Sequence, residues 1–385
     1  MEHTTVKKRG LAALISLCPA AHAIALAGAA LIAVFFAAKD NAPLMRRLSA
    51  EIVHPLHQRL GVLSARLPFS LAELLYALAI GGTLVYIIIE LARLIRRGER
   101  AKRLYRLLLR LLALVLAVYA LFCLLWGVYY YGDDFVARSG LEMEEISAED
   151  LELVTLWFAA RLNEYAPQVA RDETGLCRTD REAVLRSSPT LYRQAAARFP
   201  TLDGPELPAK GMFFSRLMSV IDFTGFFCPF TAEANVNMDF PEALFAATVA
   251  HELSHQRGVA KEQEANFTAV LASLESGDPD YCYSACMLAY IHLGNALAGV
   301  DRSAARLIRD GLDAGVRRDL AENNAYWKQF EGPVQTVTDA VYEGFLQSYD
   351  QELGMRSYGA CVDLLVKFYR ADAAAYFGLT PRAER

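Results

Sequence analysis

Residues 245–276 read FAATVAHELSHQRGVAKEQEANFTAVLASLES and contain two helical patterns separated by a turn. The small and apolar residues before His251 would bury one helix face, and Pro241 suits a first helical turn. Gly258 is a natural stop after the first pattern, so we expect a helix from about Pro241 to Arg257. A second helix should follow at once, with an apolar stripe along one face.

The first helix carries an HExxH box formed by His251, Glu252 and His255. Two histidines four residues apart share one helix face, so both imidazoles can bind a single Zn²⁺. A zinc ion lowers the pKa of a bound water toward 7, and Glu252 would take the proton of that water as the general base. The box therefore predicts a zinc hydrolase with Glu252 as its catalytic residue. The alternative is a solvated helix with incidental histidines.

Two acidic residues near the start of the second helix, Glu262 and Glu264, are candidates for the third metal ligand. Each residue turns a helix by about 100°, which places Glu264 near the edge of the apolar stripe facing the first helix and turns Glu262 largely away. We therefore expect Zn²⁺ to be held by His251, His255 and Glu264. Glu262 would be a first-turn carboxylate favoured by the helix dipole, and the same alternative applies to Glu264.

Other residues indicate which class of zinc peptidase to expect and which groups could stabilise the oxyanion. Lys261 occupies the position at which a metzincin has its third histidine, and an ammonium group cannot bind zinc at neutral pH without a large pKa shift. Peptide hydrolysis also requires an oxyanion donor, for which Tyr283, His292 and Tyr358 are equivalent candidates. His292 could instead be a distant ligand, although a lone histidine in an apolar helical pattern is more often a core residue.

The chain has a mean hydropathy of +0.20, and its apolar residues gather near the N-terminus. Three apolar runs, at residues 11–38, 71–92 and 107–131, are each long enough to cross a bilayer, which needs roughly 20 residues. The first run follows a basic stretch as a signal peptide does, but it is longer than a signal core, which favours an uncleaved span. We expect a membrane anchor over residues 1–131 and a second domain over residues 132–385.

The distribution of charge predicts the orientation and the partners. The N-terminal tail and the 93–106 connection together carry ten Lys and Arg residues, against six near the other ends of the spans. The positive-inside rule then places residues 132–385 outside the cytoplasm. That domain has 15 more acidic than basic residues, which excludes a nucleic-acid footprint. The expected partners are the lipid bilayer and a peptide or protein substrate.

Most of the second domain has helical patterning, as in residues 148–165 and from residue 281 onward. Residues 230–238 are the exception, because apolar and polar residues alternate there as in a strand. A strand just before the metal helix fits a zincin-like arrangement, in which an edge strand binds an extended peptide. Its polar row would face that cleft or the solvent. The expected fold is mainly α, with three transmembrane helices and a largely helical α+β domain that has a small sheet.

Four segments also resemble a known family: LPFSLAELLY (67–76), GMFFSRLMSVIDFTGFFCPFTAEANVN (211–237), HELSHQRGVAKEQEANF (251–267) and RSYGACVDLL (356–365). In this order they are similar to the bacterial membrane-protein family catalogued as domain of unknown function 3810. The resemblance covers nearly the whole chain and implies a three-span anchor and a zincin-like metallopeptidase domain without an established substrate. Residues 264–271 also resemble the third-ligand helix of bacterial zinc peptidases that cleave repressors, which supports Glu264.

The sequence thus predicts a membrane-anchored zinc metallopeptidase. Two alternatives stay open. One is a non-catalytic envelope protein in which the metal site is structural or vestigial, and the other is a hydrolase of cell-wall amide bonds. A closed site with four protein ligands would favour the structural alternative, and an open coordination position would favour an enzyme.

Overall fold

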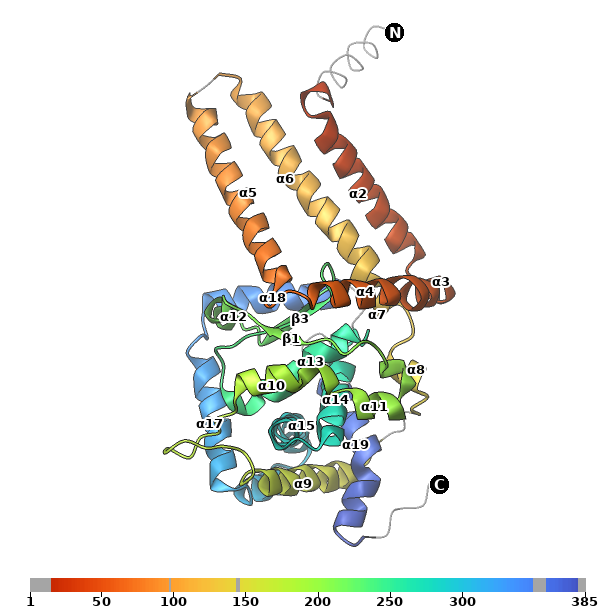
Figure 1. Cartoon of the computed structure of the whole chain (residues 1–385), viewed down its shortest axis with the longest axis vertical. Coiled ribbons are helices and arrows are strands. Elements are labelled where there is room, and N and C mark those ends of the chain that lie inside the picture. The colour runs from red at the N-terminus through yellow and green to blue at the C-terminus, as the bar shows by residue number, and fades with distance from the viewer. Residues whose placement is uncertain (1–14, 97, 143–145, 349–357, 380–385) are drawn as a thin grey trace. The chain divides into compact units, whose positions relative to one another are not determined.

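The computed structural model describes residues 15–96, 98–142, 146–348 and 358–379. These residues are mostly helical, with one three-stranded sheet (Figure 1), so the prediction of a mainly α protein is confirmed. The chain divides into two compact units. The first comprises Met1–Val53 and Ala72–Gly132, and the second comprises His54–Leu71 and Asp133–Arg385.

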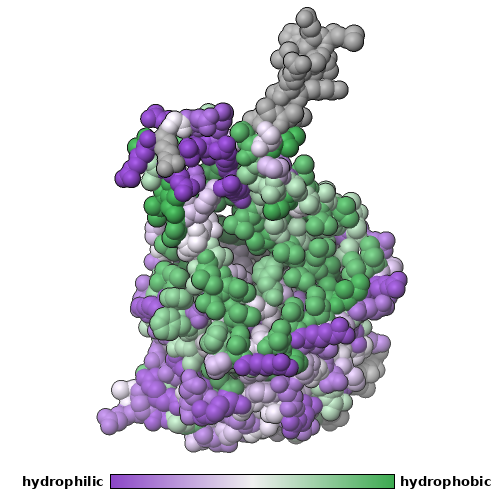
Figure 2. Space-filling model, turned by 45° about the horizontal axis from the view of Figure 1, so that its top comes forward, coloured by the Kyte–Doolittle hydropathy of each residue, from purple (hydrophilic) through white to green (hydrophobic). Residues whose placement is uncertain are grey.

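The first unit contains the three helices that are long and apolar enough to cross a membrane, as predicted. They are α2 (Pro19–Ala38), α5 (Leu71–Arg96) and a third composed of α6 (Arg100–Phe122), a π-helical segment (Cys123–Gly127) and α7 (Val128–Tyr130). Residues 11–14 of the first predicted span lie outside the described residues. Hydrophobic side chains cover much of the outer surface of these helices (Figure 2), which indicates a membrane protein. Between α2 and α5 the chain forms α3 (Ala42–Arg47), a π-helix (Leu48–Val53) and α4 (His54–Ser64).

Helices α2 and α6 pack closely because small residues line their contact. Ala21, Ala25 and Ala113 are buried in this seam. A Cβ atom on Gly28 would lie 3.0 Å from the main-chain carbonyl of Leu116. Small residues that allow two backbones to approach are typical of helix contacts in membranes.

The second unit is built around a small sheet of β1 (Ala209–Gly211), β2 (Gly225–Cys228) and β3 (Glu233–Val236). The strand order is β1-β3-β2, with β3 parallel to β1 and antiparallel to β2. In this register Gly225 pairs with Val236. The predicted strand at 230–238 is therefore β3, but its predicted edge position is wrong, because β3 is central and β2 is an edge strand.

The polar row of β3 faces neither a cleft nor the solvent. Glu233, Asn235 and Asn237 are all buried. Glu233 forms an ion pair of 2.5 Å with Lys210, and Asn235 accepts a hydrogen bond of 2.6 Å from Ser70. Buried polar groups need such partners, and both of these come from segments far away in the sequence.

The helices cover this sheet in layers. Helix α13 (Phe245–Gln256) packs on β2 and β3, and α14 (Glu262–Ser276) packs on α13. Helices α15 (Pro279–Val300), α9 (Ala148–Tyr165) and α19 (Tyr358–Tyr376) complete the core, and α9 matches the predicted helix. The remaining α-helices in the described part of the unit are α4, α8 (Phe135–Ser139), α10 (Arg181–Ser187), α11 (Arg193–Arg198), α12 (Ser215–Val220), α16 (Arg302–Asp310), α17 (Ala314–Lys328) and α18 (Pro333–Ser348).

The second unit extends beyond the predicted range of 132–385, because it includes His54–Leu71. The His57 ring donates to the carbonyl of Pro229 at 3.1 Å. Lys210 Nζ donates to the main-chain carbonyls of Ser64 and Phe69 at 2.7 and 2.9 Å. Residues 54–71 are thus bound to the sheet of their own unit.

Candidate metal centre

Helix α13 presents both histidines of the HExxH box on one face. The rings of His251 and His255 lie edge to face with centroids 4.7 Å apart. Helix α13 begins at Phe245, later than the predicted Pro241, because residues 242–244 form a 3-10 turn, and it ends at Gln256, one residue before the predicted end. Gly258 follows with φ +77° and donates to the carbonyl of His255 at 2.9 Å. A left-handed residue at this place closes the helix and turns the chain back, so α14 begins beside the end of α13.

The second nitrogen of each imidazole is held by a hydrogen bond. His255 Nδ1 donates to the carbonyl of Val259 at 2.7 Å, and His251 Nδ1 lies 2.8 Å from Oδ1 of Asn266. Both acceptors favour the tautomer with the proton on Nδ1. Such contacts fix ring orientation in metal sites and direct Nε2 toward the ion.

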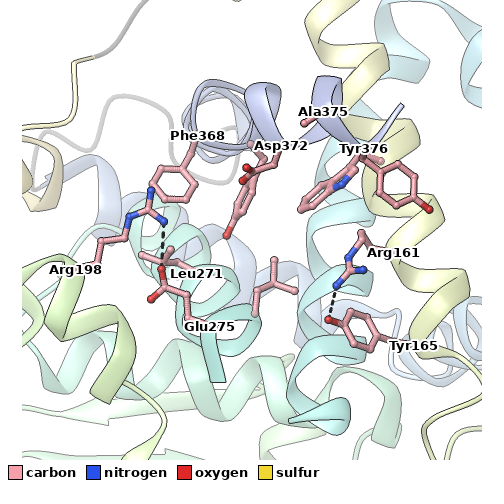
Figure 3. A pocket seen from close by; sticks show the side chains of 12 residues that line it. Arg161, Tyr165, Arg198, Leu271, Glu275, Phe368, Asp372, Ala375 and Tyr376 are labelled. Carbon is pink, nitrogen blue, oxygen red and sulfur yellow. Dashed lines mark hydrogen bonds and ion pairs between the residues drawn. The ribbon is translucent and has the colours of Figure 1, made fainter. Parts of the chain in front are cut away.

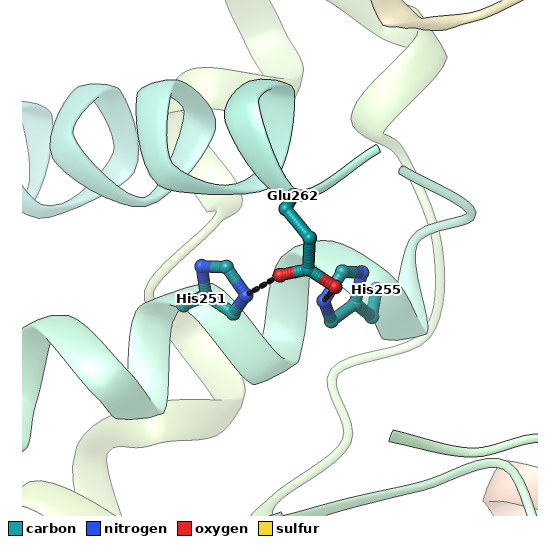
Figure 4. A group of neighbouring side chains, drawn as sticks. All are labelled: His251, His255 and Glu262. Carbon is teal, nitrogen blue, oxygen red and sulfur yellow. Dashed lines mark hydrogen bonds and ion pairs between the residues drawn. The ribbon is translucent and has the colours of Figure 1, made fainter. Parts of the chain in front are cut away.

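Glu262, the first residue of α14, supplies the carboxylate between the two histidines (Figure 4). Its Oε2 lies 3.1 Å from Nε2 of His251, and its Oε1 lies 3.6 Å from Nε2 of His255. Ligand atoms of the three residues all lie within 4.8 Å of one another. This set of two imidazoles and one carboxylate is typical of zinc sites.

Glu264, which we predicted as the third ligand, does not join this group. It is buried, and its two oxygens accept from the main-chain N–H groups of Phe135 and Val136 at 2.9 and 3.0 Å. These are the first residues of α8, where N–H groups have no partner within their own helix. The carboxylate that groups with the two histidines is therefore Glu262 and not the predicted Glu264, which instead caps another helix.

The physical reason for this difference is the turn between the two helices. Helix α14 starts directly after the turn that follows Gly258, so its first residue lies closest to the end of α13. The apolar stripe of α14 packs into the core, with Phe267 fully buried. The sequence feature that indicates Glu262 is its position as a carboxylate at the start of the second helix. This position decides which carboxylate lies near the histidines, more than the angle calculated from the apolar stripe does.

Glu252 is buried next to the histidines and carries an unsatisfied oxygen. Among the described residues, its Oε2 has no hydrogen-bond partner. Burial raises the pKa of Glu252 to about 7. A Cβ atom on Gly225 would lie 2.5 Å from Oε1 of Glu252, so the glycine at the start of β2 makes room for this carboxylate. A buried carboxylate that lacks partners is expected where a ligand completes the site.

The charges in the site suit a cation. Burial lowers the pKa of His255, but the negative charge of Glu262 outweighs this effect and raises it to about 9. Burial likewise acts to raise the pKa of Glu262, yet the two histidines hold it well below its usual range. A proton on His255 thus balances the carboxylate, and a metal dication would replace that proton.

Tyr342 on α18 is a further residue of the site that sequence reasoning missed. Its hydroxyl group donates to Oε1 of Glu262 at 3.1 Å. Its ring packs edge to face on Phe223, with centroids 5.6 Å apart. No motif marks this tyrosine, because it lies 80 residues after its partner and only tertiary folding brings them together.

The three oxyanion candidates have different surroundings. Tyr283 is buried and hydrogen-bonded to Arg171 and Asp319, so it belongs to a separate polar cluster. His292 is buried on α15, and burial together with the charge of His251 lowers its pKa to about 4. The side chain of Tyr358 lies outside the described residues. Of the candidates that the structure describes, His292 is the one that interacts electrostatically with the site.

A cavity of about 380 Å³ lies among α9, α14 and α19 (Figure 3). Three of its charged residues have partners in the cavity wall: Arg198 pairs with Glu275 at 3.4 Å, and Arg161 donates to the hydroxyl group of Tyr165 at 2.6 Å. The cavity adjoins the C-terminal end of α14, whereas Glu262 is at the N-terminal end of that helix. It is therefore separate from the candidate metal centre.

A comparison with known protein families shows to which family this chain belongs. The family model described as "Protein of unknown function (DUF3810)" matches residues 49–366. That range includes the sheet, the HExxH box, Glu262 and Tyr342. Neither the curated proteins nor the solved structures gave a match. Because the family model covers most of the sequence, this chain belongs to the DUF3810 family.

Proposed function

We propose that this protein is a membrane-anchored zinc metallopeptidase. The observation that carries the proposal is the convergence of His251, His255 and Glu262 within 4.8 Å, beside the buried carboxylate of Glu252. Two imidazoles and one carboxylate can hold Zn²⁺ and leave a fourth coordination position open. Glu252 would supply the general base that such a site needs.

The composition of the group favours catalysis over a structural role. Structural zinc sites are closed by four protein ligands, most often including cysteine. Within the part of the chain that the structure describes, the ligand group has three members. An open position is what a hydrolytic site requires.

Zinc bound there would supply a Lewis acid and a water activated near neutral pH. The protein's own contribution is proton transfer. Glu252 would take a proton at Oε2 from the water that attacks the substrate carbonyl, and would then deliver it to the amine that leaves when the C–N bond breaks. Its pKa of about 7 suits both halves of this exchange. Tyr342 and Asn266 hold Glu262 and His251 in position.

The sheet favours a peptide as the substrate. Strand β2 is an edge strand, and its first residue, Gly225, lies against Glu252. An extended peptide that pairs with an edge strand by main-chain hydrogen bonds would carry its carbonyl groups past this carboxylate. This arrangement supports peptide hydrolysis outside the cytoplasm, the side given by the distribution of Lys and Arg residues.

The test is Glu252→Gln in the purified full-length protein. This change removes the proton acceptor but none of the three ligands, so about one zinc per chain should remain bound. Hydrolysis of a fluorogenic peptide library should fall by about 10²–10⁴-fold, the usual contribution of general acid–base catalysis. Peptidoglycan fragments, assayed in parallel, separate a peptidase from a cell-wall amide hydrolase.

Glu173→Gln is the matched control, because Glu173 is an exposed loop carboxylate. It should leave both zinc content and turnover unchanged. A wild-type protein that binds zinc but hydrolyses neither substrate class would favour the non-catalytic alternative. Full activity of Glu252→Gln would refute the role of this residue as the base.

A further inference from the structure

The second unit exposes apolar side chains on two neighbouring helical segments. Phe213, Phe214 and Leu217, at the start of α12, are 86%, 49% and 60% exposed. Val334, Val337 and Val341 are more than half exposed and follow one another along α18 at helical spacing. We call these six residues the apolar face. Single exposed apolar residues are ordinary, but a contiguous group marks an interaction site.

Contacts within the unit show that α12 and α18 are adjacent. The guanidinium group of Arg216 lies 4.6 Å from the ring centroid of Phe330, just before α18. Gln335 on α18 donates to Asp222, just after α12, at 3.0 Å. Figure 1 shows both helices at the same end of this unit as α4. The six side chains therefore belong to one region of the surface.

This region lies next to the point at which the chain enters an apolar helix. Phe69 is 48% exposed and precedes by two residues the start of α5 at Leu71. Lys210 on β1 donates to the carbonyl of Phe69 at 2.9 Å. Pro68 and Phe213 line one cavity of about 560 Å³. The apolar face is thus continuous with residues that must lie at headgroup depth if α5 crosses a bilayer.

We propose that the apolar face inserts into the headgroup and upper acyl region of the bilayer that α5 enters. Phenylalanine, leucine and valine side chains at this depth leave water for an apolar medium. A lipid surface is favoured over a protein partner because the face adjoins the membrane entry point of the same chain.

This contact would determine where the enzyme finds its substrate, a consequence that rests on the proposed function. Helix α18 exposes Val337 and Val341 and also places Tyr342 at 3.1 Å from Glu262. The candidate metal centre therefore lies beside a helix in contact with lipid. The substrates would be extended peptide segments close to the membrane surface.

The test uses full-length protein in nanodiscs of phosphatidylcholine and phosphatidylglycerol. Phe213→Cys and Val337→Cys are labelled with bimane; the native cysteines are buried, and unsubstituted protein measures background labelling. Lipids with a doxyl group near the headgroup should quench both labels by about twofold or more if they lie at the interface. Leu307→Cys is the matched control, because Leu307 is 80% exposed on α16, and its label should be unaffected.

Folding of each labelled variant is verified by its thermal melting curve. Absence of quenching at both Phe213→Cys and Val337→Cys, or equal quenching at Leu307→Cys, would overturn the proposal and leave a protein partner as the occupant of the face. The same labels in a Glu252→Gln background should be quenched equally. The membrane contact and the peptidase function can therefore fail independently.

Discussion

The hydroxyl group of Tyr342 lies 3.1 Å from Oε1 of Glu262. Tyr342→Phe keeps the ring that packs on Phe223 and removes the hydrogen bond to Glu262. Groups that orient a metal ligand typically contribute 10–100-fold in affinity or activity, so we expect a loss of about that size. Chelator competition measures zinc affinity, and initial rates measure kcat and KM.

Tyr376→Phe is the control for this change. The hydroxyl group of Tyr376 donates a hydrogen bond of 2.6 Å to Glu164 in another part of the unit. It should leave zinc affinity and turnover unchanged. If Tyr342→Phe behaves like this control in both measurements, Tyr342 does not position the ligand.

The sequence could predict two residues of the candidate ligand group but not the third. The spacing of His251 and His255 requires only a helix, which is a local property. The choice between Glu262 and Glu264 depends on how α14 starts and on what lies near it. The carboxylate of Glu264 accepts hydrogen bonds from the N–H groups of Phe135 and Val136. Because these residues are distant in the sequence, the residues around Glu264 do not indicate the contact.

At the scale of elements, the approach of β2 to α13 is tested by Gly225→Ala. The added methyl carbon would lie 2.5 Å from Oε1 and 2.7 Å from Cγ of Glu252. The carboxylate must therefore move, and a shift of about 1 Å in a catalytic group can cost about 10²-fold in turnover. We expect kcat to fall by about that factor while zinc remains bound.

Gly344→Ala is the matched control, because a Cβ atom at Gly344 would meet nothing within 4 Å. Metal analysis and peptide hydrolysis on the two variants give the comparison. Unchanged turnover in Gly225→Ala would show that the position of the Glu252 carboxylate against β2 is not needed for catalysis.

Helices were easier to predict than the sheet for a physical reason. Helix α9 has the predicted bounds because its cap at Ser147 and its apolar spacing are local. The alternation in β3 also predicted a strand, but not its neighbours. The buried polar row depends on Lys210 and Ser70, so the sequence of β3 alone could not show which strand is central.

At the scale of the whole molecule, the proposed orientation places the second unit outside the cytoplasm. Ten Lys and Arg residues on one side of the spans against six on the other predict this topology. A reporter active only outside the cytoplasm should score when fused after residue 140 and fail when fused near Gly98. The reverse pattern would refute the orientation without affecting the metal site.

The three apolar helices were predictable because their length and composition are sequence properties. The assignment of His54–Leu71 to the second unit was not. It depends on hydrogen bonds such as that from His57 to Pro229, which join residues far apart in the chain. The position of this segment between two apolar runs does not indicate these hydrogen bonds.

The central claim, that His251, His255 and Glu262 hold zinc, is tested most directly by comparing zinc affinity in Glu262→Gln and Glu264→Gln. Chelator competition on the full-length protein supplies the measurement. Glu262→Gln removes a charged ligand and should weaken zinc binding by at least about tenfold. Glu264→Gln alters a cap on α8 and should bind about one zinc per chain with wild-type affinity. Loss of zinc in Glu264→Gln together with wild-type affinity in Glu262→Gln would contradict the account.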